Sequence, residues 1–293
     1  MSTWIAVDWG TTALRVTLMD GAHPLDTRSS GDGMNTLARD GFEPALLALV
    51  EDWLDGPMPV VACGMVGARQ GWAEAPYATT PCPPVTGRMI PVLTHDRRLE
   101  VRIVPGVRQL SPHADVMRGE ETQIAGILLT EKDFDGVACL PGTHTKWAHI
   151  SAGEIVSFRT VMTGELFATI AGQTVLRHSL SGDGWDEGPF LEAVSDALSR
   201  PETLTARLFE LRAADLLHGQ SATQARSVLS GLLIGAELAA TRPWWLGRDV
   251  VITGADKTTR AYASALRAQG VRPRIHPAAD MTLAGLRSAK DKI

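Results

Sequence analysis

Three short turns that combine glycine with hydroxyl side chains are the segments of this chain best suited to bind phosphate. The first contains Gly10, Thr11 and Thr12, the second Gly142, Thr143, His144 and Thr145, and the third Gly254 and Ala255. Each follows an apolar run that predicts a β-strand, so backbone N–H groups and hydroxyls can approach phosphate oxygens there. The third turn leads into a predicted helix, whose N-terminus favours an anion. The sequence therefore predicts a phosphate site assembled from separate segments.

Asp8 ends the first predicted strand, directly before the first of these turns. A carboxylate at this place can bind a phosphate-bound Mg²⁺, directly or through water. The alternative is an ordinary hairpin in which Asp8 only holds the turn. We therefore treat Asp8 as the candidate metal ligand.

Strands and helices that would position these residues follow from hydrophobic periodicity. Predicted strands cover residues 5–7, 14–18, 24–31, 59–63, 101–104, 137–140, 147–150, 154–160, 248–255 and 274–276. Predicted helices cover residues 42–54, the second half of 115–129, 188–198, 202–217, 221–240, 258–269 and 281–289. The strand, Gly-Thr turn and returning strand at the N-terminus recur near residue 140, which is typical of two related lobes that each hold phosphate.

The composition limits the class of protein. With 293 residues, 44% hydrophobic and 21% charged, and a net charge of -5, the chain resembles a globular protein without general attraction for nucleic acid or anionic membranes. It contains no run of about 20 apolar residues, and a cytoplasmic location is expected. Cys63, Cys82 and Cys139 are widely separated, so we expect free thiols and neither disulfides nor a zinc site.

Several motifs together resemble one family. They are Asp8-Trp-Gly-Thr-Thr-Ala-Leu-Arg15, Gly64-Met-Val-Gly67 with Gly71-Trp72, Val116-Met-Arg-Gly-Glu-Glu-Thr-Gln123, Pro141-Gly-Thr-His-Thr-Lys-Trp147, Phe158-Arg-Thr-Val-Met-Thr-Gly-Glu165 and Ser230-Gly-Leu-Leu-Ile-Gly-Ala-Glu237. The ordered turns resemble the phosphate-one, phosphate-two and adenosine motifs of the sugar kinase, Hsp70 and actin superfamily. Within it, the chain is similar to the 2-dehydro-3-deoxygalactonokinases. Asp256-Lys257 depart from the small polar residues expected after the third glycine.

This resemblance implies an α/β, two-lobed actin-like and ribonuclease H-like ATPase fold, with mixed sheets flanked by helices and the active site in the interlobe cleft. Residues 1–130 would form the N-terminal lobe and residues 131–293 the C-terminal lobe. An alternative is that the last helix returns to the first lobe. The implied reaction transfers phosphate from ATP, with Mg²⁺, to O6 of 2-dehydro-3-deoxy-D-galactonate in galactonate catabolism.

The resemblance also implies roles for residues outside the phosphate turns. Related sugar kinases carry an acidic base at the beginning of a helix, where this chain has Glu120 and Glu121, and the following Thr-Gln favours Glu121. A helix-capping role is the alternative, and Asp115 and Glu165 are competitors for the base. The substrate carboxylate would need a cation such as Arg15, Arg118 or Arg159, and Gly64, Met65, Val66 and Gly67 would shape the sugar pocket, unless they only end a strand.

Two other functions remain open from sequence. A kinase of the same fold acting on another sugar or sugar acid would keep the three turns and change the loop after residue 64 and the arginines. A non-catalytic ATP-switched binding protein would need only the nucleotide turns, but this chain has little room for an attached partner-binding domain. A small-molecule partner is expected, with a homodimer as an option.

Overall fold

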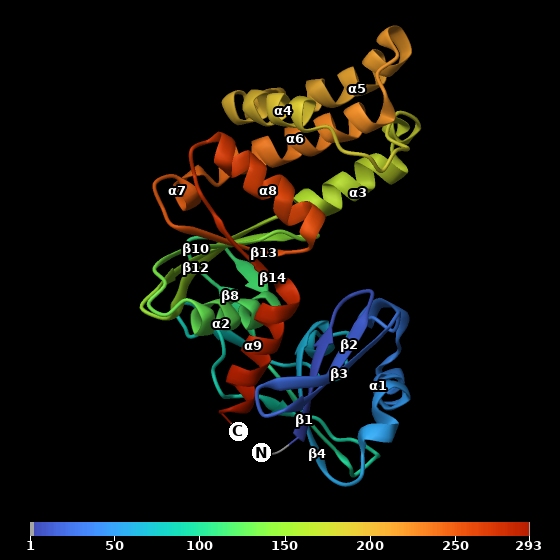
Figure 1. Ribbon diagram of the computed structural model, residues 1–293, viewed down its shortest axis with the longest axis vertical. Helices are drawn as coiled ribbons and strands as arrows, with labels where there is room; N and C mark the ends of the chain where they lie inside the picture. The colour runs from blue at the N-terminus through green and yellow to red at the C-terminus, as the bar shows by residue number, and fades with distance from the viewer. Residues whose placement is uncertain (1–2, 293) are drawn as a thin grey trace. The chain divides into compact units, whose positions relative to one another are not determined.

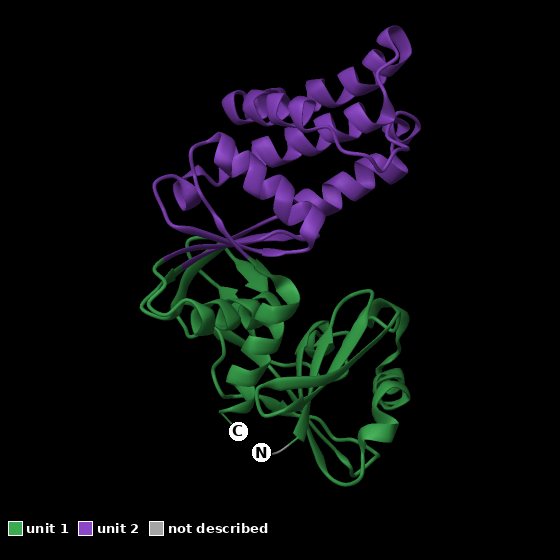
Figure 2. Cartoon of the chain, viewed as in Figure 1, with its two compact units in different colours: residues 1–135, 150–158, 276–293 green, residues 136–149, 159–275 purple. Residues whose placement is uncertain are grey.

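The computed structural model describes residues 3–292, which group into two compact units (Figure 2). Unit 1 contains residues 1–135, 150–158 and 276–293, and unit 2 contains residues 136–149 and 159–275. The functional lobes expected from the sequence, 1–130 and 131–293, stay a prediction. Among the described residues, no helix has both the length and the apolar character needed to cross a membrane.

Unit 1 is built on a six-stranded mixed sheet in the order β3-β2-β1-β4-β7-β6. Its strands are β1 (Thr3–Trp9), β2 (Leu14–Asp20), β3 (His23–Ser30), β4 (Met58–Gly64), β6 (Ile90–Pro91) and β7 (Leu99–Ile103). The first three form an antiparallel meander, whereas β4 runs parallel to both β1 and β7. Parallel β1 and β4 therefore end at the same edge of the sheet.

Both faces of β1 are buried, because apolar side chains occupy its odd and its even positions. The helices of unit 1 are α1 (Phe42–Val50), α2 (Glu120–Thr130) and α9 (Ala278–Lys290). Val7 and Trp9 share a core with Phe42 of α1, and the Trp9 and Phe42 ring centroids lie 5.0 Å apart. Trp4, on the other face, shares a second core with Leu286 of α9. Helices thus cover the central strand on both sides.

A small three-stranded sheet leads the chain into α2. Its strands, in the order β5-β8-β9, are β5 (Tyr77–Thr79), β8 (Gly106–Gln109) and β9 (Asp115–Met117). Helix α2 then packs closely on α9 (Figure 1). A Cβ atom added to Gly285 would lie 1.8 Å from the Thr122 carbonyl oxygen, and one added to Gly126 would lie 2.0 Å from the Met281 carbonyl oxygen. Glycine is required at both positions because the two backbones touch.

Unit 2 takes its strands from a five-stranded sheet in the order β12-β11-β10-β13-β14. These strands are β10 (Gly136–Leu140), β11 (Thr145–Ser151), β12 (Glu154–Val161), β13 (Val250–Gly254) and β14 (Arg274–Pro277). The helices of unit 2 are α3 (Thr163–Gln173), α4 (Glu187–Ser199), α5 (Leu204–His218), α6 (Ala222–Ala240), α7 (Arg242–Trp245) and α8 (Asp256–Ala268). Helix α6 packs against both α4 and α5 (Figure 1).

Candidate active site

The carboxyl ends of β1 and β4 meet the N-terminus of α2 in unit 1. Asp8 pairs with Cys63 in the parallel register, and Trp9 pairs with Gly64. A Cβ atom on Gly119, the residue before α2, would lie 3.3 Å from the Gly64 Cα atom. Gly64 and Gly119 have φ angles of 88° and 106°, a backbone conformation that glycine adopts without strain. Two glycines thus bring the α2 N-terminus against the sheet edge that carries Asp8.

The predicted phosphate-one turn is fixed by backbone hydrogen bonds, and its threonine side chains are exposed. The N–H groups of Met34 and Asn35 donate to the carbonyl oxygens of Gly10 and Thr11 at 3.1 and 3.0 Å. Thr11 and Thr12 themselves are exposed. The hydroxyl groups of this turn are therefore available to a phosphate group.

Asp8 combines partial burial with a cationic neighbour. Its side chain is 35% exposed, and Arg15 Nη1 lies 3.7 Å from Asp8 Oδ2. Burial raises the pKa of the Asp8 carboxyl, and the Arg15 charge opposes that rise. No group of three or more His, Cys, Asp or Glu side chains suited to a metal occurs within residues 3–292. A Mg²⁺ ion here would therefore take most of its oxygen ligands from phosphate and water, a donor set that Mg²⁺ commonly uses.

Glu121 is the most deeply buried of the predicted acidic residues, with no exposed surface. Its Oε2 accepts a hydrogen bond from the Gly119 N–H at 2.7 Å, and its Oε1 accepts one from Thr122 Oγ1 at 3.0 Å. Burial, with the neighbouring Glu120 charge as a second cause, raises the pKa of Glu121 to about 7. A carboxyl group with a pKa near neutral pH can accept and release a proton under working conditions.

Glu120 occupies a different environment from Glu121. It is half-buried, and its Oε2 accepts a hydrogen bond from the Arg118 N–H at 3.0 Å. Both glutamates therefore accept from backbone N–H groups just before α2, as the helix-capping interpretation predicts. Of the two competitors for the base, Asp115 lies on β9, whereas Glu165 pairs with His144 in unit 2, their side-chain atoms 2.5 Å apart.

Arg118 lies beside the Gly64–Gly67 turn, with its guanidinium group stacked 4.3 Å from the centre of the Tyr77 ring. Its Nη2 donates to the Ala75 carbonyl oxygen at 2.7 Å. A Cβ atom on Gly67 would lie 2.8 Å from Arg118 Nη1, so the turn backbone is close to the cation. Arg118 Nε and Nη1 are buried without a hydrogen-bond partner among the described residues. Unpaired buried donors of this kind suit an anionic ligand.

The other predicted substrate residues differ in their surroundings. Arg15 is about half exposed on β2, and Arg159 lies half-buried on β12 in unit 2. Gly64, Val66 and Gly67 are buried, and Met65 is half-buried. Tyr77, which stacks on Arg118, was not among the predicted site residues; its place in the loop after Gly64 was the only signal.

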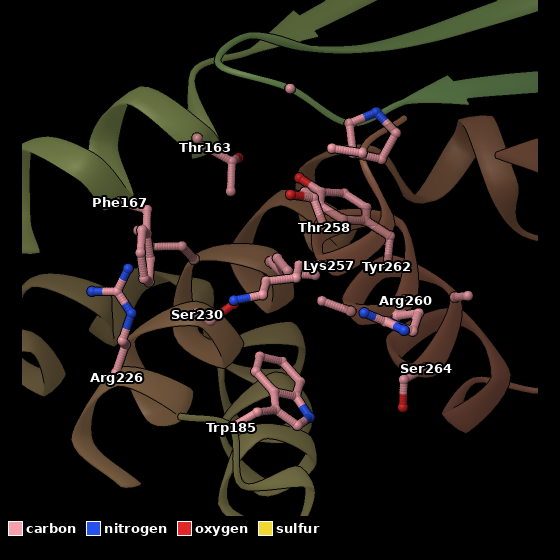
Figure 3. A pocket seen from close by; sticks show the side chains of 18 of the residues that line it. Thr163, Phe167, Trp185, Arg226, Ser230, Lys257, Thr258, Arg260, Tyr262 and Ser264 are labelled. Atoms are coloured by element: carbon pink, nitrogen blue, oxygen red, sulfur yellow. The ribbon is translucent and has the colours of Figure 1, made fainter. Parts of the chain in front are cut away.

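Unit 2 contains a cavity of about 930 Å³ (Figure 3). Gly142, Thr143 and Ala255, three of the predicted nucleotide residues, line it. Further lining residues are Thr163, Phe167, Asp183, Trp185, Glu187, Arg226, Lys257, Arg260, Tyr262 and Arg267. The cavity has aromatic surface on which a nucleobase can pack, and more cationic than anionic side chains to bind phosphates. Its volume is within the usual range for small-molecule sites.

Three other predicted nucleotide residues of unit 2 do not line this cavity. Gly254 packs behind it, where a Cβ atom would lie 2.9 Å from the Pro141 carbonyl oxygen. His144 is exposed and bonds to Glu165, and Thr145 is buried with its hydroxyl 2.9 Å from the Tyr262 hydroxyl. The sequence analysis did not identify Phe167, Trp185 and Arg226 as site residues. They follow no spacing rule, and only the folded chain brings them to one cavity. Lys257 was noticed only as a departure from the adenosine motif.

The fold is the two-lobed fold of the actin-like ATPases, built from mixed sheets and helices. A xylulose kinase structure from Lactobacillus acidophilus, 13% identical, covers 100% of this chain and 89% of its own with a TM-score of 0.52, which is a similarity of fold alone.

Closer similarities identify the family. The 2-keto-3-deoxy-galactonokinase family matches residues 8–289, and the chain belongs to this family of ATP-dependent kinases. A protein named a probable 2-dehydro-3-deoxygalactonokinase from Rhizobium meliloti is 40% identical, covering 98% of this chain and 96% of its own. The 2-dehydro-3-deoxygalactonokinase of Escherichia coli is 36% identical, covering 91% and 90%. A crystal structure from Sinorhizobium meliloti described as this kinase is 39% identical and has a TM-score of 0.90, covering 98% and 97%.

Proposed function

We propose that this protein phosphorylates 2-dehydro-3-deoxy-D-galactonate at O6, using ATP and releasing ADP and the 6-phosphate. Membership of the 2-keto-3-deoxy-galactonokinase family supports the substrate. The observation that carries the chemistry is the buried Glu121 carboxyl, with a pKa of about 7, at the sheet edge that also carries Asp8. The candidate base and the candidate metal ligand thus belong to the same end of the sheet in unit 1.

ATP would occupy the cavity of unit 2 with its adenosine part. The exposed turn at Gly142-Thr143 would approach its phosphates, and the cations Arg226, Lys257 and Arg260 would balance their charge. The turn at Gly10, Thr11 and Thr12 offers a second set of phosphate contacts. Mg²⁺, when bound, neutralises charge on the phosphate oxygens, and Asp8 is the residue that would hold it, directly or through water.

Glu121 would take the proton from the acceptor hydroxyl, and Glu120 is the alternative base. Removal of the proton lets the hydroxyl oxygen attack the terminal phosphorus atom of ATP while the bond to the bridging oxygen breaks, which leaves ADP. Glu121 is fully buried, so the sugar acid would reach it only if the covering residues move. Glu120 is accessible without such a movement.

Arg118 is the best-supported partner for the substrate carboxylate. Its unpaired Nε and Nη1 groups lie beside the glycine turn that would admit the sugar acid, whereas Arg15 is already close to Asp8. Because ATP is an intracellular metabolite, we place the reaction in the cytoplasm. A homodimer stays a prediction.

The test is ADP release from Mg-ATP with four conditions: 2-dehydro-3-deoxygalactonate, its gluconate epimer, galactose and no acceptor. We expect turnover with the first acid, and a loss of at least a hundredfold in Glu121→Gln, the range for removal of a general base. Turnover only with another acceptor would favour the alternative, a kinase of the same fold for a different sugar or sugar acid. Activity that survives Glu121→Gln and is lost in Glu120→Gln would move the base to Glu120.

A further inference from the structure

Glu237 is a buried acidic residue that the proposed reaction does not use. It lies on α6 and is 2% exposed. Its Oε1 accepts a hydrogen bond from Trp147 Nε1 at 2.7 Å, and its Oε2 accepts one from the Tyr262 hydroxyl at 2.6 Å and another from Thr163 Oγ1. One carboxyl group therefore receives donors from three other elements, β11, α8 and α3. Such a network fixes its members in one arrangement when all of its polar groups are paired.

Two of these partners are walls of the unit 2 cavity. Thr163 and Tyr262 both line it, and Figure 3 shows their side chains among those that surround it. The Tyr262 hydroxyl also contacts Thr145 Oγ1, at the end of the predicted phosphate-two turn, at 2.9 Å. Through Tyr262, Glu237 is therefore linked both to the cavity wall and to the predicted phosphate-two turn.

Thr163 connects the network to the same turn by a second route. It begins α3, and the next residue, Gly164, lies so close to the turn that a Cβ atom there would be 2.2 Å from the Gly142 carbonyl oxygen. The Glu165 N–H donates to the Thr143 carbonyl oxygen at 3.0 Å. The first turn of α3 therefore sets the position of Gly142 and Thr143, and Glu237 holds the residue at which α3 begins.

We propose that Glu237 is a positioning residue for nucleotide binding, which keeps the turn at Gly142-Thr143 and the Thr163 and Tyr262 walls in the arrangement that receives ATP. The proposal depends on the assignment of this cavity to the nucleotide. Burial raises the pKa of the Glu237 carboxyl above its usual value, and the hydrogen bonds from Thr163, Tyr262 and Trp147 oppose that rise. An amide cannot accept from all three donors, since its nitrogen only donates.

The experiment compares wild-type enzyme with Glu237→Gln, Tyr262→Phe and a matched control, Asp215→Asn. Asp215 also accepts two side-chain hydrogen bonds in unit 2, from Ser179 Oγ at 2.6 Å and Arg212 Nη1 at 2.8 Å, but it does not line the cavity. The readouts are the Kd of ADP by calorimetry, the KM values for ATP and the sugar acid, and Tm.

We expect Glu237→Gln to raise the Kd of ADP and the KM for ATP about tenfold, the size of effect that one broken buried hydrogen bond has. The KM for the sugar acid should stay within about twofold, and Asp215→Asn should lower Tm without changing the Kd of ADP. If Glu237→Gln does not fold, the Tyr262→Phe variant provides the test. We expect its Kd for ADP to be at least about threefold higher than that of wild type, because the substitution removes one donor to Glu237 and keeps the ring.

Nucleotide affinity equal to wild type in folded Glu237→Gln would overturn the proposal, as would an equal loss of affinity in Asp215→Asn. These outcomes leave the proposed function intact, because the wild type still binds ADP. Failure of the wild-type enzyme itself to bind ADP would overturn the assignment of the cavity, and this inference with it.

Discussion

Glu121→Gln should make the protein more stable at alkaline pH while it removes activity. The carboxyl of Glu121 has its pKa raised from 4.5 to about 7 by burial, with the Glu120 charge as a second cause. Each pKa unit corresponds to about 1.4 kcal/mol, so the shift amounts to about 3 kcal/mol. The amide side chain of the variant keeps the shape of the protonated carboxyl and carries no charge to desolvate.

The sign follows from which state holds the proton more tightly. With a raised pKa, the folded protein binds the Glu121 proton more tightly than the unfolded chain, so the stabilisation is complete below about pH 4.5. It is lost as the pH rises to about 7, and above that pH the wild type carries the whole cost of a buried charge. Glu121→Gln removes this dependence.

The assay is thermal unfolding of wild type and variant between pH 5 and pH 8.5. The stability of the variant relative to wild type should rise by about 2.5 kcal/mol over this range, which is about 5 to 10 °C in Tm. Glu120→Gln is the matched control; its side chain contacts solvent, so a smaller difference is expected. A stability difference for Glu121→Gln that does not change with pH would refute the reasoning. In the wild type, kcat/KM should rise with pH through about 7, because the base must be ionised.

Two further substitutions test the packing and the substrate site. Gly285→Ala should destabilise the protein by about 2 kcal/mol or more in urea unfolding, because its methyl group would overlap the Thr122 carbonyl oxygen. Gly172→Ala, in a helix with open space around it, should be neutral or stabilising, and an equal loss in both would contradict this account. Arg118→Met should raise the KM for the sugar acid at least about tenfold and leave the KM for ATP unchanged, with Arg118→Lys intermediate. An unchanged KM for the sugar acid in steady-state kinetics would show that Arg118 only supports the loop.

Periodic segments of the sequence were sufficient to predict most of the fold. The helices expected at 188–198, 202–217 and 221–240 are confirmed as α4, α5 and α6, because their apolar residues repeat at helical spacing. The strands β8 and β9 were not predicted. They are three or four residues long, and a strand of that length shows too few alternations to stand out from a loop.

The candidate sites of unit 1 and unit 2 differed in how far the sequence could predict them. Asp8, Gly142 and Glu121 are each next to a strand end or a helix start, so local patterns indicated them. Trp185 and Arg226 lie far apart in the chain, and only the folded chain brings both of them to the lining of one cavity. The burial of Glu121, which gives it its pKa, depends on packing and could not be predicted from neighbours in the sequence.

The packing of α9 on α2 has a consequence for synthesis of the protein. Residues 136–149 and 159–275 of unit 2 are translated before α9, whereas the core around Trp4 needs Leu286 and Ala289 from that helix. Since α9 follows all of unit 2 in the chain, α2, with Glu120 and Glu121 at its beginning, lacks its partner helix until the residues of unit 2 have been synthesised. Helix α2 therefore reaches its final surroundings only after α9 has been synthesised.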